Sequence, residues 1–191
     1  MEILKPISKK DLNTAAKLIY QADKQYYDIF SDSKDKSVEK ILKMYSDERT
    51  DFSKVKAIYS DKKMIGSMVY YSASERHMRQ SFDMSYLKLS ENIDVKALRK
   101  FNENVPNFTS DGLYLSRIAI IPEYQGKSFC KKSLNLLSCI ALSAGYKEIL
   151  VHVRGDNYSA LKCYIHMGYE NINHTNNKLY KVFKKKLIKK N

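Results

Sequence analysis

Residues 113–130 read LYLSRIAIIPEYQGKSFC, an apolar segment that runs into a polar turn. The apolar part predicts a strand, which Pro122 ends because proline has no N–H for the next ladder bond. A helix is expected from about Lys127 to Ala144, with Gly145 placed to end it. A tight turn between a strand and a helix presents unpaired backbone N–H groups and the positive end of the helix dipole. We therefore expect an anion site here.

The triplet Gly126, Lys127 and Ser128 also fits the end of a nucleotide-binding P-loop. That loop needs a further glycine five residues before Gly126, where this chain has Ile121. Pro122 would also remove one of the N–H groups that hold phosphate. We therefore reject a P-loop and keep an anion site suited to a carrier with a pyrophosphate, such as coenzyme A.

A second motif, NYSALKCYIHMGY at residues 157–169, follows after a predicted helix and a predicted strand. Together with RIAIIPEYQGKS at 117–128, it resembles the GNAT superfamily of N-acetyltransferases over about Leu113–Tyr169. The resemblance implies the acyl-CoA N-acyltransferase fold, an α/β fold whose mixed, mostly antiparallel central sheet is flanked by helices. It also implies direct transfer of an acetyl group from acetyl-CoA to a primary amine, on a small molecule or a protein, and leaves a homodimer open.

The resemblance assigns a cofactor site. The acetyl-CoA loop of the family begins with Arg or Gln, here Gln125, and normally has glycine where this chain has Ser128 and Cys130, because the backbone takes unusual angles there. Ile118 and Ile120 would offer main-chain groups to the pantetheine arm and the acetyl carbonyl where the strand bulges. The residues implied to bind the cofactor are Ile118, Ala119, Ile120, Gln125, Gly126, Lys127, Ser128, Phe129, Cys130, Asn157, Ala160 and Tyr164.

Tyr164 is the catalytic residue that the resemblance implies, at the place of the family tyrosine that approaches the CoA sulfur. A phenol with a pKa of about 10 can donate a hydrogen bond or a proton to the leaving thiolate. The base that takes the proton of the amine stays open among Glu75, His77 and Asp111, each of which is also an ordinary solvated residue. His152 is expected to be a hydrogen-bonded core histidine.

The acceptor side is harder to interpret. Tyr26, Tyr27 and Phe30, together with Tyr70 and Tyr71, either line a substrate slot or pack in the core, and we favour packing. An irregular insertion is predicted at about 72–110, with a helix from about 95 to 102. Long connections of this kind often carry function.

Length and composition fit one globular domain, residues 1–191, with 43% hydrophobic residues. The three cysteines have no CxxC spacing, so we expect neither a disulfide framework nor a metal site, and Cys130 and Cys163 lack the His and Asp partners of a nucleophile. A reducing compartment follows from this. Because no apolar run is long enough for a signal peptide or a membrane span, we expect a cytoplasmic protein without a membrane partner.

The formal net charge is +13, but the lysines are spread along the chain. We interpret this charge as a solvated surface and expect no nucleic-acid partner, which would need a clustered basic face. The densest group, Lys184–Lys186 with Lys189 and Lys190, is predicted to be an unstructured tail. Besides the enzyme, one alternative of the same fold stays open, a non-catalytic acyl-CoA-binding or regulatory module, motivated by Ser128 and Cys130.

Overall fold

The computed structural model describes residues 3–31, 33–88, 94–105, 111–172 and 179–188. Within these residues a seven-stranded sheet has the order β1-β2-β3-β4-β5-β7-β6. Its neighbouring strands are antiparallel except for β4 and β5. The prediction of a mixed, mostly antiparallel sheet is confirmed. The strands are β1 (Ile3–Pro6), β2 (Val55–Ser60), β3 (Lys63–Ser72), β4 (Leu113–Ile120), β5 (Glu148–Arg154), β6 (Glu170–Asn171) and β7 (Tyr180–Lys186).

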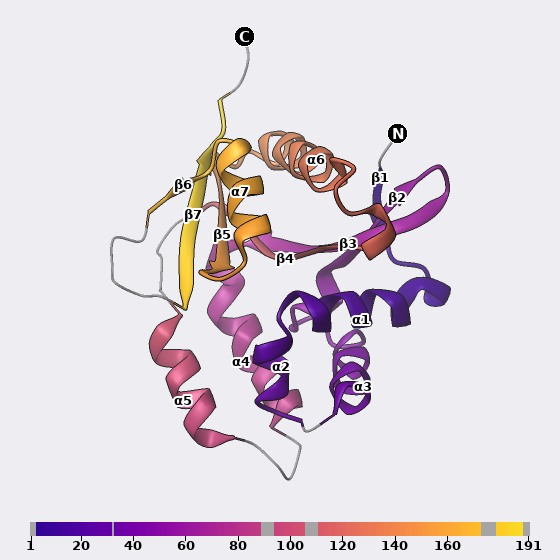
Figure 1. Cartoon of the computed structure of the whole chain (residues 1–191), viewed down its shortest axis with the longest axis vertical. Coiled ribbons are helices and arrows are strands. Elements are labelled where there is room, and N and C mark those ends of the chain that lie inside the picture. Colours follow the sequence, from indigo (N-terminus) through magenta and orange to yellow (C-terminus); the bar gives the residue numbers. More distant parts are fainter. Residues whose placement is uncertain (1–2, 32, 89–93, 106–110, 173–178, 189–191) are drawn as a thin grey trace.

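Helices cover both faces of the sheet (Figure 1). One side carries α1 (Leu12–Ala22), α2 (Lys24–Asp28), α3 (Lys34–Met44), α4 (Arg76–Leu87) and α5 (Val95–Asn104). The other side carries α6 (Phe129–Ser143) and α7 (Tyr158–His166). Each face has its own apolar core, and successive residues of β4 alternate between them, with Tyr114 in the first core and Leu113 and Leu115 in the second.

The two central strands β4 and β5 separate part of the way along their length. Their parallel register in the described residues runs from Leu113 opposite Ile149 to Leu115 opposite Val151, although β4 itself continues to Ile120. At the same point the register between β3 and β4 shifts, which leaves Ser116 as an extra, bulged residue. Because a bulge bends its strand, β4 turns away from β5 beyond this point (Figure 1).

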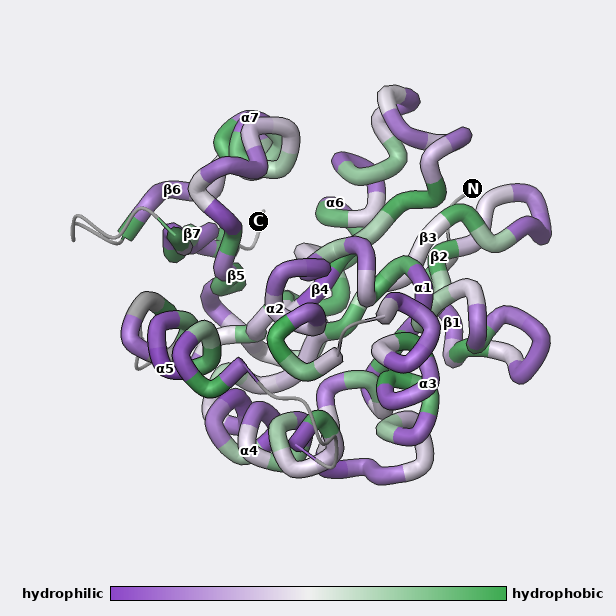
Figure 2. The backbone as a smooth tube through the Cα atoms, turned by 60° about the horizontal axis from the view of Figure 1, so that its bottom comes forward, coloured by the Kyte–Doolittle hydropathy of each residue, from purple (hydrophilic) through white to green (hydrophobic). Residues whose placement is uncertain are grey.

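The prediction of an irregular insertion at about 72–110 was wrong for residues 76–87, which form α4. The buried face of α4 consists of Arg76, Arg79, Asp83 and Leu87, so three of its four inward positions are ionisable residues. Hydrophilic and intermediate residues therefore dominate α4 in Figure 2, and no apolar stripe marks the helix in the sequence. The helix predicted at about 95–102 is present as α5, whereas residues 89–93 and 106–110 lie outside the described residues.

The lysine triplet near the C-terminus belongs to the sheet, in contrast to the predicted tail. Strand β7 pairs with β5 through Lys186, which lies opposite Glu148. The Nζ atom of Lys184 also lies 3.5 Å from a carboxylate oxygen of Glu148. Pairing along a central strand outweighs the local charge of the triplet, while Lys189 and Lys190 lie outside the described residues.

Candidate active site

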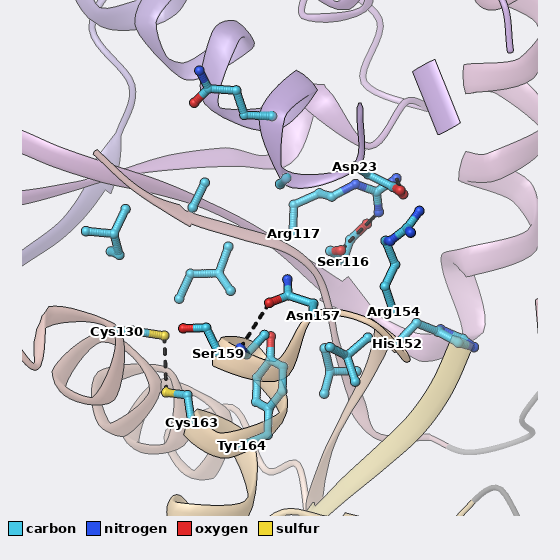
Figure 3. Close-up of a pocket in the computed structure, with 18 of the residues that line it drawn as sticks. Asp23, Ser116, Arg117, Cys130, His152, Arg154, Asn157, Ser159, Cys163 and Tyr164 are labelled. Atoms are coloured by element: carbon cyan, nitrogen blue, oxygen red, sulfur yellow. Dashed lines mark hydrogen bonds and ion pairs between the residues drawn. The ribbon is translucent and has the colours of Figure 1, made fainter. Parts of the chain in front are cut away.

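A cavity of about 660 Å³ occupies the space where β4 and β5 separate. It is lined from both faces of the sheet, and Figure 3 shows residues from the two sides. We call the part lined by the start of α6 and by α7 the α6–α7 half. The part on the opposite side of the sheet, where α1, α2 and α4 lie, is the α1–α4 half. Its lining also includes residues of β3, β4 and β7 and of the loop at Asp51. The polar residues of the α1–α4 half include Asp23, Tyr26, Asp51, Tyr71, Arg76, Asp83, Tyr114, Ser116, Arg117 and Tyr180.

The structure brings together the residues that the sequence assigned to the cofactor, with one exception. Lys127 does not line the cavity: it is exposed, with its Nζ atom 5.7 Å from the centre of the Tyr124 ring. Lys131, in the first turn of α6, lines the cavity in its place and was missed by the sequence analysis. The assigned residues that do line the cavity are Ile118, Ala119, Ile120, Gln125, Gly126, Ser128, Phe129, Cys130, Asn157, Ala160 and Tyr164.

The turn before α6 has the backbone conformation that the missing glycine would have supplied. Gly126 has a φ of 74° and Ser128 a φ of 62°, so Ser128 takes the left-handed conformation as the N-cap of α6. Its side chain makes no capping hydrogen bond. The side-chain amide of Gln125 donates to the carbonyl oxygen of Ile120 at 2.9 Å and ties the turn to β4. The side chain of Ser128 therefore does not compete with an anion for the first N–H groups of α6.

Ser128→Gly should raise the free energy of unfolding by about 0.5–1 kcal/mol, because glycine takes a positive φ without the steric cost that serine bears there. Urea denaturation of the two proteins measures the difference. The matched control is Gly126→Ala, which adds the same strain to the same turn in open space and should lower the free energy of unfolding by about 1 kcal/mol. A less stable Ser128→Gly protein would contradict this account of the turn.

Tyr164 lies at the centre of the α6–α7 half. Its side chain is only 4% exposed and packs against Tyr169, with ring centres 5.3 Å apart. Figure 3 shows its hydroxyl pointing into the cavity. Burial, followed by the nearby Cys130, raises the pKa of Tyr164 well above 10. The phenol therefore keeps its proton at neutral pH and acts as a hydrogen-bond donor.

Asn157 caps α7, since its side-chain oxygen accepts a hydrogen bond from the N–H of Ala160 at 3.1 Å. This bond fixes the first turn of α7 beside the cavity. The cap helps to set where Ala160 and Tyr164 stand, and the part of Asn157 in a cofactor site stays a prediction.

A chain of polar contacts runs through the α1–α4 half. Arg117 donates to the carbonyl oxygen and hydroxyl of Ser116 at 2.9 and 3.0 Å and pairs with Asp23 at 3.4 Å. The hydroxyl of Ser116 in turn donates to Oδ2 of Asp51 at 2.5 Å. Burial alone would lower the pKa of Arg117, but its interactions with the Tyr27 phenol and with the carboxylates of Asp23 and Asp51 outweigh burial and raise the pKa well above its usual value. Arg117 is therefore a fixed cation.

Asp51 and Asp83 form a carboxyl pair in this half. The backbone N–H of Asp51 donates to Oδ1 of Asp83 at 2.9 Å, and Asp83 is 5% exposed. Burial and the charge of Asp51 raise the pKa of Asp83 well above its ordinary value, so Asp83 holds its proton more tightly than an exposed carboxyl does. Within the described residues Oδ1 of Asp51 has no hydrogen-bond partner. A bound ammonium or water would satisfy it.

This pair predicts a pH-dependent stability. A carboxyl with a raised pKa in the folded protein stabilises the fold below the unfolded pKa of about 3.9, and this contribution is lost as the pH rises toward the folded pKa, at about 1.4 kcal/mol per pH unit. Asp83→Asn keeps the oxygen that accepts from Asp51 and cannot ionise. We measure the free energy of unfolding of both proteins by urea titration from pH 4 to 8. The value for the variant minus the value for the natural protein should increase as the pH rises. Parallel pH profiles would contradict the raised pKa.

The predicted base candidates do not line the cavity. Glu75 accepts from the Nε of Arg79 at 2.9 Å, and His77 and Asp111 are exposed. His152 is hydrogen-bonded as expected, with its Nδ1 3.1 Å from the hydroxyl of Tyr114, but it lines the cavity.

The aromatic residues considered for the acceptor side divide between the two interpretations, a substrate slot and core packing. Tyr26 and Tyr71 line the cavity, whereas Tyr27 and Phe30 are buried away from it and Tyr70 is half-buried.

Among the described residues no helix is long and apolar enough to cross a bilayer, and no three His, Cys, Asp or Glu side chains gather as a metal site.

Comparisons with known proteins agree with this geometry. The family model described as Acetyltransferase (GNAT) family matches residues 19–169. An N-acetyltransferase from Staphylococcus aureus Mu50 is 18% identical, with a TM-score of 0.66 over 96% of this chain and 100% of the other. The PaiA N-acetyltransferase from Thermoplasma acidophilum, solved with coenzyme A, is 16% identical, with a TM-score of 0.57 over 97% and 99%. A search of curated protein sequences gives no match. The chain belongs to the acetyltransferase (GNAT) family.

Proposed function

We propose that the protein transfers an acetyl group from acetyl-CoA to a primary amine of a small molecule or a protein. The observation that carries the proposal is one cavity with an anion-binding turn and a protonated tyrosine in one half and carboxyl groups in the other. Family membership supports the reaction class, and the related PaiA protein was solved with coenzyme A. Acetyl-CoA would supply the reactive thioester.

The α6–α7 half fits the coenzyme. The first N–H groups of α6, behind Gly126 and Ser128, would hold the pyrophosphate. The edge of β4 beyond Leu115, which leaves the register with β5, would offer the main-chain groups of residues 118–120 to the amides of the pantetheine arm. Lys131 lines this part of the cavity and adds a positive charge. In this assignment Ser128, Cys130 and the bulged strand β4 would all contribute to the binding of the coenzyme.

The α1–α4 half fits the amine. An incoming ammonium must lose one proton before it can attack a carbonyl carbon. We assign the acceptance of this proton to Asp51, directly or through water, because the raised pKa of Asp83 favours the protonated form of that neighbour. Arg117 and Ser116 hold the Asp51 carboxylate in place through the contact at 2.5 Å. Tyr164 then donates a hydrogen bond to the leaving thiolate from the opposite half.

Calorimetry with acetyl-CoA and a thiol-release assay over a panel of amines test the proposal. We expect binding of acetyl-CoA and release of CoA with at least one primary amine, but none with the matching tertiary amine, which has no proton to lose after attack. Tight binding without turnover on any amine would favour the alternative, a non-catalytic acyl-CoA-binding module. Absence of binding would contradict both.

A further inference from the structure

Two cysteines from separate elements meet inside the α6–α7 half. Cys130 belongs to the first turn of α6 and Cys163 to α7, and their sulfur atoms lie 3.3 Å apart (Figure 3). Both thiols are half-buried, line the cavity and are not joined by a disulfide bond. The third cysteine, Cys139, is exposed on α6 and does not line the cavity. The pair is therefore placed for chemistry that Cys139 cannot share.

The surroundings of the pair distinguish its two members. When Cys163 loses its proton, the S–H of Cys130 can donate to the thiolate, and this contact lowers the pKa of Cys163 to about 7 against the opposing effect of burial. Lys131 adds to the lowering. The same contact, together with burial, raises the pKa of Cys130 well above its usual value. Cys163 is thus the thiol that reacts first, and Cys130 stands ready as its partner.

We propose that Cys130 and Cys163 form a reversible disulfide that closes the coenzyme site when a peroxide oxidises the protein. The Cys163 thiolate attacks one oxygen of hydrogen peroxide, releases hydroxide and becomes a sulfenic acid. The sulfur of Cys130 attacks that sulfur, so the S–S bond forms and water leaves. In total, two thiols lose two electrons and two protons, and the peroxide is reduced to two waters. A reducing dithiol reverses the bond.

The disulfide would act on the coenzyme through geometry. A disulfide bond is about 2.05 Å long, so sulfur atoms that stand 3.3 Å apart must approach by more than 1 Å, which draws the start of α6 toward α7. The N–H groups assigned to the pyrophosphate belong to that first turn, and Ser128 stands just before it. The bond therefore moves the anion site and prevents the two walls from separating around a ligand. This inference rests on the proposed function of the cavity.

The test uses the full-length protein, reduced and then treated with stoichiometric hydrogen peroxide. Intact mass should fall by two hydrogen atoms, and peptide mapping should link residue 130 to residue 163. By calorimetry, the oxidised protein should bind acetyl-CoA about tenfold more weakly or worse, and dithiothreitol should restore the affinity. Cys139→Ser should behave as the natural protein does. Cys130→Ser and Cys163→Ser, each compared with its own reduced form, should show no loss of affinity on oxidation.

Two results would overturn the inference: no link between residues 130 and 163 at stoichiometric peroxide, or a linked protein that binds acetyl-CoA as tightly as the reduced one. A reduced protein that fails to bind acetyl-CoA contradicts the proposed function and the regulation built on it. The mass spectrum still decides separately whether the bond forms, so the two failures are distinguishable.

Discussion

Asp51→Asn should lower the turnover number about a hundredfold at saturating acetyl-CoA, the scale that a positioned general base contributes. The amide keeps an oxygen that can accept from Ser116 but cannot take a proton from the amine. Because Asp51 lies in the α1–α4 half, the affinity for acetyl-CoA should hardly change. Steady-state kinetics on the best amine of the panel, with calorimetry for acetyl-CoA, provide both numbers.

The matched comparison is Asp83→Asn, in the same carboxyl pair. The raised pKa favours the protonated form of Asp83, which an amide resembles, so the loss of turnover should be much smaller than for Asp51. If the two variants exchanged order, Asp83 would be the base. An Asp51→Asn enzyme within about threefold of the natural one would remove Asp51 from the reaction.

Tyr164→Phe should lower turnover about tenfold or more, because the leaving thiolate loses its hydrogen-bond donor. The phenyl ring keeps the packing against Tyr169 and Phe183, so the fold and the affinity for acetyl-CoA should be retained. The pKa of Tyr164 is raised well above 10, which makes the phenol a weak acid and a poor source of a full proton. Its main effect is therefore a hydrogen bond to the thiolate, and turnover should show no titration of Tyr164 up to pH 9.

Tyr169→Phe is the control for this substitution. Tyr169 is 3% exposed, packs on Tyr164 and does not line the cavity, so it reports the cost of removing a buried hydroxyl at the same place. Its hydroxyl has no hydrogen-bond partner in the described residues, and the variant should keep nearly full turnover. Equal losses in the two variants would make the effect of Tyr164 structural.

The sequence was sufficient for the α6–α7 half because that half comes from two short, contiguous motifs. The turn residues, the cap at Asn157 and the spacing to Tyr164 all depend on neighbouring residues alone. The sequence therefore predicts which of these residues line the cavity. The prediction that Lys127 lines the cofactor site did not match the cavity lining, and the reason is also local. The helix begins at Phe129, two residues after Lys127. Positive φ angles on both sides of Lys127 accompany a side chain that lies over Tyr124, outside the cavity.

The α1–α4 half was not predictable in the same way. Asp51, Asp83 and Ser116 come from three segments that are far apart in the sequence and meet only in the folded structure. The buried face of α4 carries charge, so hydrophobic periodicity did not even mark the helix that presents Asp83. Hydrogen bonds compensate for the burial of such polar groups. The guanidinium of Arg79, for example, donates to the carbonyl oxygens of Glu48 and Thr50 at 2.8 Å each.

The separation of β4 from β5 places an open strand edge in the interior of a sheet. An open edge is normally a liability, because any extended chain can add to it. Here that same property would let an arm with amide groups lie against the edge like an additional strand. Recognition of this kind is carried by the peptide backbone, so the arm would make no demand on the side chains of Ile118, Ala119 and Ile120. The side chains of Ile118 and Ile120 are constrained instead by the core they pack against, and proline is the residue that the backbone contact would exclude.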